Sequence, residues 1–316
     1  MAELWKKAQN VLHEVNRVIL GKEKVTEEVL LAFLADGHVL LKDIPGVGKT
    51  TLALAFSKAM ALDFRRVQFT PDLMPSDLTG FSIYRREEER FVYQPGCVFC
   101  NLLLADEINR TSPKTQSALL EVMEERRVTV DGVTREVESP FLVIATQNPD
   151  GSAGTQQLPE AQVDRFLLTA ALGYPDFEHE LKMAMEVGGT SRILPVNQVI
   201  DKEELLQMQQ QIHQIYMKES VYRYLLELIT ETRSHPYLER GASPRGTIAL
   251  VKTAKAMAWL HGESYVTPQK VAEQFPYVVT HRIRLNAAAQ MERIRKEQVL
   301  TEILNKVKKP PMGEKT

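Results

Sequence analysis

The sequence contains little cysteine, few aromatic residues, no marked excess of charge of either sign and no long apolar run. Only two of its 316 residues are cysteine and 7% are aromatic, while 41 acidic residues face 39 lysines and arginines, for a net charge of −2. This balance gives no bulk attraction to nucleic acid or to an anionic membrane. No apolar run approaches the roughly 20 residues that span a bilayer. We therefore expect neither nucleic-acid binding nor membrane insertion.

The N-terminus is predicted to be an amphipathic helix, with apolar residues at helical spacing from Leu4 to Ile19. Glu3 and Glu14 on its polar face are untypical of a transit peptide, and the apolar segments are too broken for a signal peptide. Together these features predict a cytoplasmic protein.

The two cysteines, Cys97 and Cys100, form a single C-x-x-C motif. Structural zinc needs four ligands, and no second cysteine or histidine pair accompanies this motif. We expect two small core residues on a buried helix end, with a redox or metal role as the alternative.

Short apolar strands alternate with helical patterns from Val39 to about Phe166, which favours a parallel sheet with helices on both faces. The predicted strands are Val39–Leu41, Arg66–Phe69, Leu102–Ala105, Phe141–Ala145 and Phe166–Ala170.

Two inserted β-hairpins are predicted beside this sheet. The first pairs Phe81–Tyr84 with Phe91–Tyr93 around a tip of three arginines and three glutamates. The second pairs Val128–Val130 with Val133–Val137 across Asp131-Gly132, a strong two-residue turn signal.

The strands are expected to stop after Pro175, and the pattern is helical from Lys202 to Asn305. We therefore predict an α/β core with the N-terminal helix over residues 1–185, an all-helical domain over 186–305 and a mobile tail over 306–316. His281 and Arg282, near the end of the helical half, are predicted to be surface residues.

A glycine-containing loop follows Val39–Leu41 and leads into a helix that begins near Thr51. Such a loop points backbone N–H groups at anionic oxygens, and the helix N-terminus adds partial positive charge. Lys49 is placed to reach the β- and γ-phosphates, and the Thr50 hydroxyl to ligate Mg²⁺. The full pattern has another glycine where Asp43 stands, and the alternative is a chance Gly-Lys-Thr at a strand–helix turn. The residues expected to hold the nucleotide are Pro45, Gly46, Val47, Gly48, Lys49, Thr50 and Thr51.

Two carboxylates, Asp106 and Glu107, follow the apolar run Leu102–Ala105. Ligands of open α/β sheets bind outside the carboxyl ends of the strands, so Asp106 is expected beside Thr50, where it would hold Mg²⁺. Glu107 would then orient and polarise the water that attacks the γ-phosphate. An acidic pair after a strand is also common as a solvated turn, but the phosphate loop upstream favours the catalytic interpretation.

Three further polar residues are candidates for the same site. Asn148 ends another apolar strand and is placed to bond the γ-phosphate and the lytic water, or it simply starts the turn at Pro149. Arg165 follows an acidic residue, Asp164, and the alternative for it is a surface salt bridge, which usually contributes little. Arg245 lies in the first turn of a predicted helix, where a cation opposes the helix dipole. An anionic partner would explain Arg245, although a solvated arginine there costs little.

The residues from Gly21 to about Leu285 resemble a MoxR-type member of the AAA+ ATPases. Beyond the phosphate loop, the matching motifs are Leu103–Arg110, Ser112–Gln116, Leu158–Phe166 and Ser243–Gly246, in the family's order and spacing.

The resemblance implies an α/β fold: a P-loop parallel sheet with helices on both faces and two inserted hairpins, followed by a small all-helical lid. It also implies ATP and Mg²⁺ as cofactors, and ATP bound between the subunits of a ring, commonly a hexamer. Asn148 would be sensor 1, Arg165 the arginine finger that reaches the neighbour's γ-phosphate, and Arg245 sensor 2 on the lid. Gln68 is a candidate for restraining Glu107, and Arg110 for a contact between subunits or a surface ion pair.

Family members are similar in acting as ATP-driven, chaperone-like assembly or activation factors. They often work with a von Willebrand factor A domain protein, sometimes to insert a metal. The hairpin tips at Arg85–Arg90 and Asp131-Gly132 are the places expected to meet a client, although each is also an ordinary solvated turn.

Two other functions are weighed against this one. A nucleic-acid-translocating motor would need positive hairpin tips, whereas the tip at Arg85–Arg90 balances its arginines with glutamates. A nucleotide-gated scaffold without turnover would not need Glu107, Asn148 and Arg165 together.

Overall fold

A five-stranded parallel sheet with the strand order β2-β5-β8-β1-β9 forms the centre of the N-terminal half. The computed structural model describes residues 3–44, 46–148, 158–187 and 195–311. All five predicted core strands are confirmed, with bounds shifted by one or two residues at most ends. They are β1 (Val39–Lys42), β2 (Phe64–Gln68), β5 (Leu102–Asp106), β8 (Leu142–Gln147) and β9 (Leu168–Ala170).

The sheet is covered on both faces, because every residue of β5 and β8 is buried. Alternate residues of β5 point to opposite faces: Leu102 and Leu104 belong to one apolar cluster, and Leu103 and Ala105 to the other. The first cluster includes residues of α1 (Leu4–Asn16), α2 (Glu23–Leu34) and α3 (Lys49–Ala59). The second includes residues of α4 (Pro75–Thr79) and α5 (Pro113–Glu125).

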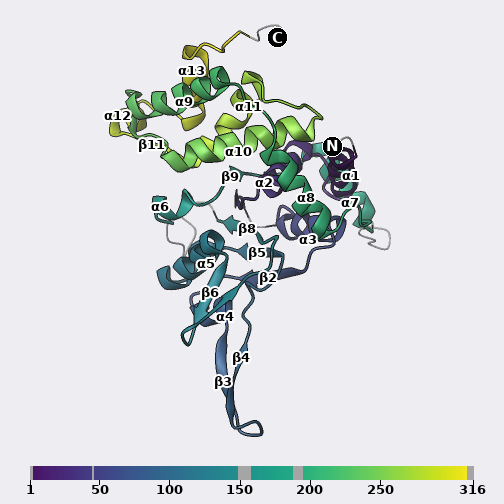
Figure 1. Cartoon of the computed structure of the whole chain (residues 1–316). Helices are drawn as coiled ribbons and strands as arrows, with labels where there is room; N and C mark the ends of the chain where they lie inside the picture. The colour runs from purple at the N-terminus through teal and green to yellow at the C-terminus, as the bar shows by residue number, and fades with distance from the viewer. Residues whose placement is uncertain (1–2, 45, 149–157, 188–194, 312–316) are drawn as a thin grey trace.

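Both inserted hairpins form where the sequence predicts them. The first consists of β3 (Phe81–Arg85) and β4 (Arg90–Gln94), and Figure 1 shows it as an arm that projects from the body of the protein. The second consists of β6 (Arg127–Val130) and β7 (Val133–Glu136), and both turn residues between these strands have positive φ angles, as a tight hairpin turn requires.

The C-terminal half is mainly helical and forms a lid (Figure 1). Its longest helix, α10, packs against α1 and α2 of the core and against α8 and α11 of the lid. The predicted breaks at Ser243-Pro244 and Thr267-Pro268 are helix starts, and each hydroxyl accepts a bond from a backbone N–H of the first turn. The helices that follow β8 are α6 (Glu160–Val163), α7 (Phe177–Val187), α8 (Lys202–His213), α9 (Glu219–Ser234), α10 (Pro244–Leu260), α11 (Pro268–Val279), α12 (Ala287–Met291) and α13 (Lys296–Lys306), and the 3₁₀ segments are Ile108–Arg110 and Thr280–Arg282.

Two predictions about local structure are wrong. Strands do not stop after Pro175, because β10 (Leu238–Arg240) pairs with β11 (Arg284–Leu285) in a ribbon too short to show a sequence period. Cys97 and Cys100 lie in a turn after β4 rather than on a helix end, and the N–H groups of Cys97 and Val98 donate to the carbonyls of Asp77 and Leu78 instead of to a helix.

The mobile tail over 306–316 stays a prediction: α13 ends at Lys306, and residues 312–316 lie outside the described residues. In the part of the chain that the structure describes, no helix is long and apolar enough to cross a membrane.

Candidate active site

The phosphate loop connects β1 to α3, and its two glycines adopt conformations that other residues rarely take. Gly46 and Gly48 have φ angles of 87° and 92°, and nothing lies within 4 Å of the position of an added Cβ. The Lys49 ammonium spans the loop and donates to the carbonyls of Asp43 and Ile44, at 3.1 and 3.2 Å. An open backbone at the start of a helix fits a phosphate group.

The other predicted nucleotide ligands lie on the same segment. Val47 belongs to the loop, Thr50 and Thr51 are in the first turn of α3, and Pro45 lies outside the described residues.

Asp43 replaces the first glycine of the pattern and has a structural task. Its carboxylate accepts the backbone N–H groups of Leu172 and Gly173, at 2.6 and 2.8 Å. These two residues follow β9, so the buried Asp43 side chain ties the base of the phosphate loop to the segment that leads to the lid.

Asp106 ends β5 at the carboxyl edge of the sheet, and α3 packs against this strand. Its Oδ1 accepts the Thr146 hydroxyl at 2.7 Å, and its Oδ2 accepts the Arg66 guanidinium at 2.7 and 3.2 Å. Arg66 was not predicted to belong to the site, because it lies on the neighbouring strand β2 and no motif marks it. A carboxylate and the Thr50 hydroxyl are oxygen ligands of the kind that Mg²⁺ prefers, so this donor set fits the ion.

Glu107 follows Asp106 in a left-handed backbone conformation, with φ 58° and ψ 49°. Such a conformation is rare for a residue with a side chain and costs free energy, which is common at functional sites. The Glu107 N–H donates to the Thr146 hydroxyl at 2.8 Å. This bond secures the turn that directs the side chain.

Three side chains hold the Glu107 carboxylate. Asn148 donates to Oε1 at 2.9 Å, while Gln68 and Arg110 both donate to Oε2, at 2.7 and 2.8 Å. The predicted contact of Gln68 with Glu107 is therefore present. Arg110 is paired with Glu107 within its own chain.

These contacts change the acidity of Glu107. Burial acts to raise the pKa of Glu107, but the bonds from Arg110 and Asn148 and the charge of Arg110 outweigh it, so this pKa lies below its ordinary value. Glu107 is therefore ionised at neutral pH, as a residue that orients water must be.

Asn148 ends β8 beside Glu107 and is held by its backbone. Its N–H donates to Oδ1 of Asn109 at 3.3 Å, and its carbonyl accepts from Nδ2 of Asn109 at 3.4 Å. The buried Oδ1 of Asn148 has no hydrogen-bond partner among the described residues. An orphaned acceptor beside a carboxylate can receive a hydrogen from a water molecule.

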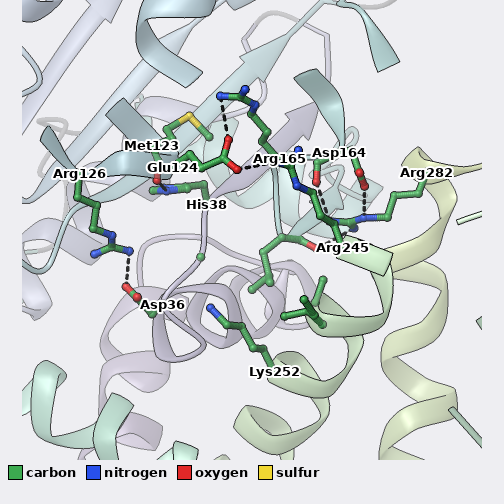
Figure 2. A pocket seen from close by; sticks show the side chains of 14 residues that line it. Asp36, His38, Met123, Glu124, Arg126, Asp164, Arg165, Arg245, Lys252 and Arg282 are labelled. Carbon is green, nitrogen blue, oxygen red and sulfur yellow. Dashed lines mark hydrogen bonds and ion pairs between the residues drawn. The ribbon is translucent and has the colours of Figure 1, made fainter. Parts of the chain in front are cut away.

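Arg165 and Arg245 lie together, at the opposite edge of the sheet from the phosphate loop. Both guanidiniums pair with the Glu124 carboxylate near the end of α5, as Figure 2 shows, with Arg165 at 3.2 Å. They line a cavity with Gly37 and His38, which precede β1, whereas the phosphate loop follows β1. Glu124 is the anionic partner expected for Arg245.

A buried ion pair that lines the same cavity joins the lid to the core. The Arg282 side chain is 2% exposed and donates to Oδ1 of Asp164 at 2.8 Å and to the Phe166 carbonyl at 2.6 Å. His281 is also buried. Both residues were predicted at the surface, and this prediction is wrong because this segment of the lid packs against Asp164 and Phe166 of the core.

The cysteines show no sign of a metal site. No cluster of three or more potential metal-ligating histidine, cysteine, aspartate or glutamate side chains occurs within residues 3–44, 46–148, 158–187 and 195–311. Burial raises the pKa of Cys97 to about 11 and that of Cys100 to about 12, so both are thiols at neutral pH.

Comparison with known proteins supports the assignment that this geometry suggests. Residues 38–168 match the model of the ATPase family associated with various cellular activities (AAA), and residues 230–303 match an AAA lid domain. The fold and these matches define an AAA-type ATPase with its lid.

Similar proteins narrow the assignment. The chain is 39% identical to Chaperone MoxR1 of Mycobacterium tuberculosis, over 96% of this chain and 83% of that protein. It is 47% identical to the uncharacterized protein YeaC of Bacillus subtilis, over 95% and 93%. A solved structure from Cytophaga hutchinsonii superposes with a TM-score of 0.90 at 39% identity, over 98% of this chain and 96% of that one. The chain belongs to the MoxR-type AAA+ ATPases.

Proposed function

We propose that this protein hydrolyses ATP in a Mg²⁺-dependent reaction at the carboxyl edge of its sheet. The observation that carries the proposal is the position of Glu107, whose ionised carboxylate is bonded to Asn148 beside the phosphate loop. The bound Mg²⁺ would neutralise charge that develops on the phosphates.

Each residue of this edge has a distinct task in the proposed reaction. The N–H groups of the loop and Lys49 bind the phosphates, while Thr50 and Asp106 hold the metal ion. Glu107 orients the attacking water and accepts its proton, and the free Oδ1 of Asn148 positions the same water.

The proposed site is shared between chains. Arg165 and Arg245 lie beyond the amino end of β1, and a strand rises about 3.3 Å per residue, so the four residues of β1 alone separate them from their own loop by about 10 Å. We infer that both arginines act on the nucleotide of a neighbouring chain, with Arg165 as arginine finger and Arg245 as sensor 2. A closed ring, which we propose to contain six chains, gives every nucleotide such a neighbour.

The proposed biological role is chaperone-like assembly, activation or metal insertion for a protein complex, together with a von Willebrand factor A domain partner. The name of the relative Chaperone MoxR1 supports the chaperone part. The arm formed by β3 and β4 is a suitable client contact, because Phe81, Tyr84 and Phe91 are exposed on it.

Binding and turnover of ATP, measured separately in two variants, test the proposed reaction. Lys49→Ala should lose binding of a fluorescent ATP analogue, whereas Glu107→Gln should bind it and hydrolyse ATP at least roughly a hundredfold more slowly than wild type. Undiminished turnover in Glu107→Gln would overturn the catalytic assignment. Binding without turnover in the wild type would favour a nucleotide-gated scaffold.

A further inference from the structure

The cavity beside Arg165 and Arg245 contains more positive than negative side chains. It has a volume of about 330 Å³ and is lined by five cationic side chains and three carboxylates. The four arginines among them are paired: Arg126 with Asp36, Arg165 and Arg245 with Glu124, and Arg282 with Asp164.

The fifth cation is Lys252, and it has no comparable partner. No hydrogen bond or ion pair joins its ammonium to any residue that the structure describes, although the side chain is partly buried. Figure 2 shows the amine pointing into the open space between Asp36 and Arg245. Lysine at a cavity wall without an anion is unusual, because partial burial disfavours the charge unless something compensates it.

The nearest titratable ring offers no compensation. His38 donates from Nε2 to the Met123 carbonyl and accepts the Val143 N–H at Nδ1, so both ring nitrogens are occupied and the ring is neutral. Burial, with smaller contributions from the charges of Arg126 and Lys252, lowers the pKa of His38 to about 4. An anion that approaches from outside the chain is therefore the available partner for Lys252.

Lys252 shares a helix face with Arg245. The two residues are seven positions apart on α10, which is about 10.5 Å along the axis and almost two full turns. Ile248 lies between them on the same face and is 59% exposed. Another chain can cover this row of Arg245, Ile248 and Lys252 if it presents an anionic group to each of the two cations.

We propose that Lys252 is a third cation of the shared ATPase site and binds a phosphate of the nucleotide held by the neighbouring chain. This inference depends on the proposed function, because it needs a neighbour whose phosphate loop faces Arg165 and Arg245. A lysine serves as a point charge for phosphate, whereas the two arginines give directed bonds. Lys252 thus extends the row of positive charge along the nucleotide.

The first experiment is ATP turnover of Lys252→Gln at a protein concentration that saturates wild-type activity. Loss of a charged contact to phosphate should slow turnover by roughly tenfold. Lys255→Gln is the matched control, since Lys255 is on the same helix and its amine bonds the His213 carbonyl instead. Wild-type turnover in Lys252→Gln would overturn the inference.

Mixtures of slow variants show on which side of the interface Lys252 acts. Glu107→Gln mixed with Lys252→Gln should regain activity, because some interfaces combine the intact loop and Glu107 of one chain with the intact Lys252 of the other. Arg165→Ala mixed with Lys252→Gln should regain none, because both changes lie on the same side. The opposite pattern would place Lys252 at its own nucleotide, and rescue by neither chain would mean a structural defect; both results overturn the inference.

A reference mixture separates this inference from the proposed function. Glu107→Gln with Arg165→Ala should regain activity whatever Lys252 does. If this mixture regains no activity, the shared site itself is contradicted. If it regains activity but the two Lys252 mixtures do not behave as predicted, only the role of Lys252 is rejected.

Discussion

Arg110 donates from Nη1 to Oε2 of Glu107 at 2.8 Å, and the two residues are three positions apart in the same chain. The same oxygen accepts the neutral amide of Gln68 at 2.7 Å. One carboxylate oxygen therefore receives one charged and one uncharged donor. The two donors can be removed separately, which distinguishes the effect of charge from that of hydrogen bonding.

The acid limb of the pH–rate profile should move further when Arg110 is replaced than when Gln68 is replaced, because only Arg110 adds a charge to its hydrogen bond. Turnover needs ionised Glu107, and the bond and charge of Arg110 help to hold its pKa below the ordinary value. In Arg110→Gln this pKa rises, so activity is lost at a higher pH than in wild type as the solution is acidified. The check is kcat/KM for ATP against pH. An unmoved limb in Arg110→Gln, or an equal shift in Gln68→Ala, would contradict the account.

The Mg²⁺ requirement should depend on Arg66. Its guanidinium occupies Oδ2 of Asp106, the carboxylate proposed to hold the metal ion. A half-exposed ion pair contributes about 0–1 kcal/mol, so Arg66→Gln should lower the half-saturating Mg²⁺ concentration by up to roughly fivefold. Arg65→Gln is the control, because Arg65 bonds the Gly96 carbonyl instead. A higher Mg²⁺ requirement in Arg66→Gln would show that Arg66 helps to place the ion rather than competing with it.

Completing the glycine pattern of the phosphate loop should harm the protein. Asp43→Gly removes the acceptor of two N–H groups, those of Leu172 and Gly173, and should lower the free energy of unfolding by about 2–3 kcal/mol. Asp43→Asn keeps one side-chain oxygen and should lose less. Urea denaturation measures both, and a glycine variant as stable as wild type would refute the structural role of Asp43.

The free energy of unfolding should fall as the pH rises from about 4.5 to about 8, because Glu28 is buried. Glu28 on α2 accepts a bond from Gln274 of α11 at 3.0 Å, and burial raises the pKa of Glu28 to about 8 from 4.5. Between these pH values the folded chain holds a proton that the unfolded chain has released, so the free energy of unfolding falls by up to about 1.4 kcal/mol per pH unit.

The test of Glu28 is the Tm between pH 5 and 8.5. Glu28→Gln should flatten the pH dependence and melt above wild type at pH 8.5, whereas Glu23→Gln, an exposed site on the same helix, should follow wild type. Parallel curves for wild type and Glu28→Gln would show that Glu28 does not carry this proton.

Features that depend on residues close together in the sequence could be predicted: strands, a hairpin turn and the phosphate-loop motif. The buried strands appear as apolar runs, the Asp131-Gly132 turn has its own residue preferences, and Gly46, Gly48 and Lys49 form a contiguous motif. The end positions of β5 and β8 also follow from the sequence, which is why Glu107 and Asn148 could be placed at one edge of the sheet.

Contacts between distant segments could not be predicted in the same way. Glu124 and Arg245 are 121 residues apart, and Asp164 and Arg282 are 118 apart. Nothing local to Arg282 signals that it will be buried between the lid and the core, and nothing local to Glu124 signals that two arginines from two domains will meet there. The pairing of Arg66 with Asp106 likewise depends on strand order, since β2 and β5 become neighbours only in the sheet.

The most direct test of the shared site is ATP turnover per chain, measured as a function of protein concentration with Mg²⁺ present, for wild type and Arg165→Ala. The account predicts that turnover per chain rises with concentration in wild type as chains assemble, and that Arg165→Ala stays slow by roughly 10³-fold or more at every concentration. Turnover that is independent of concentration and unaffected by Arg165→Ala would mean that one chain contains the complete site, and the shared-site account would then be wrong.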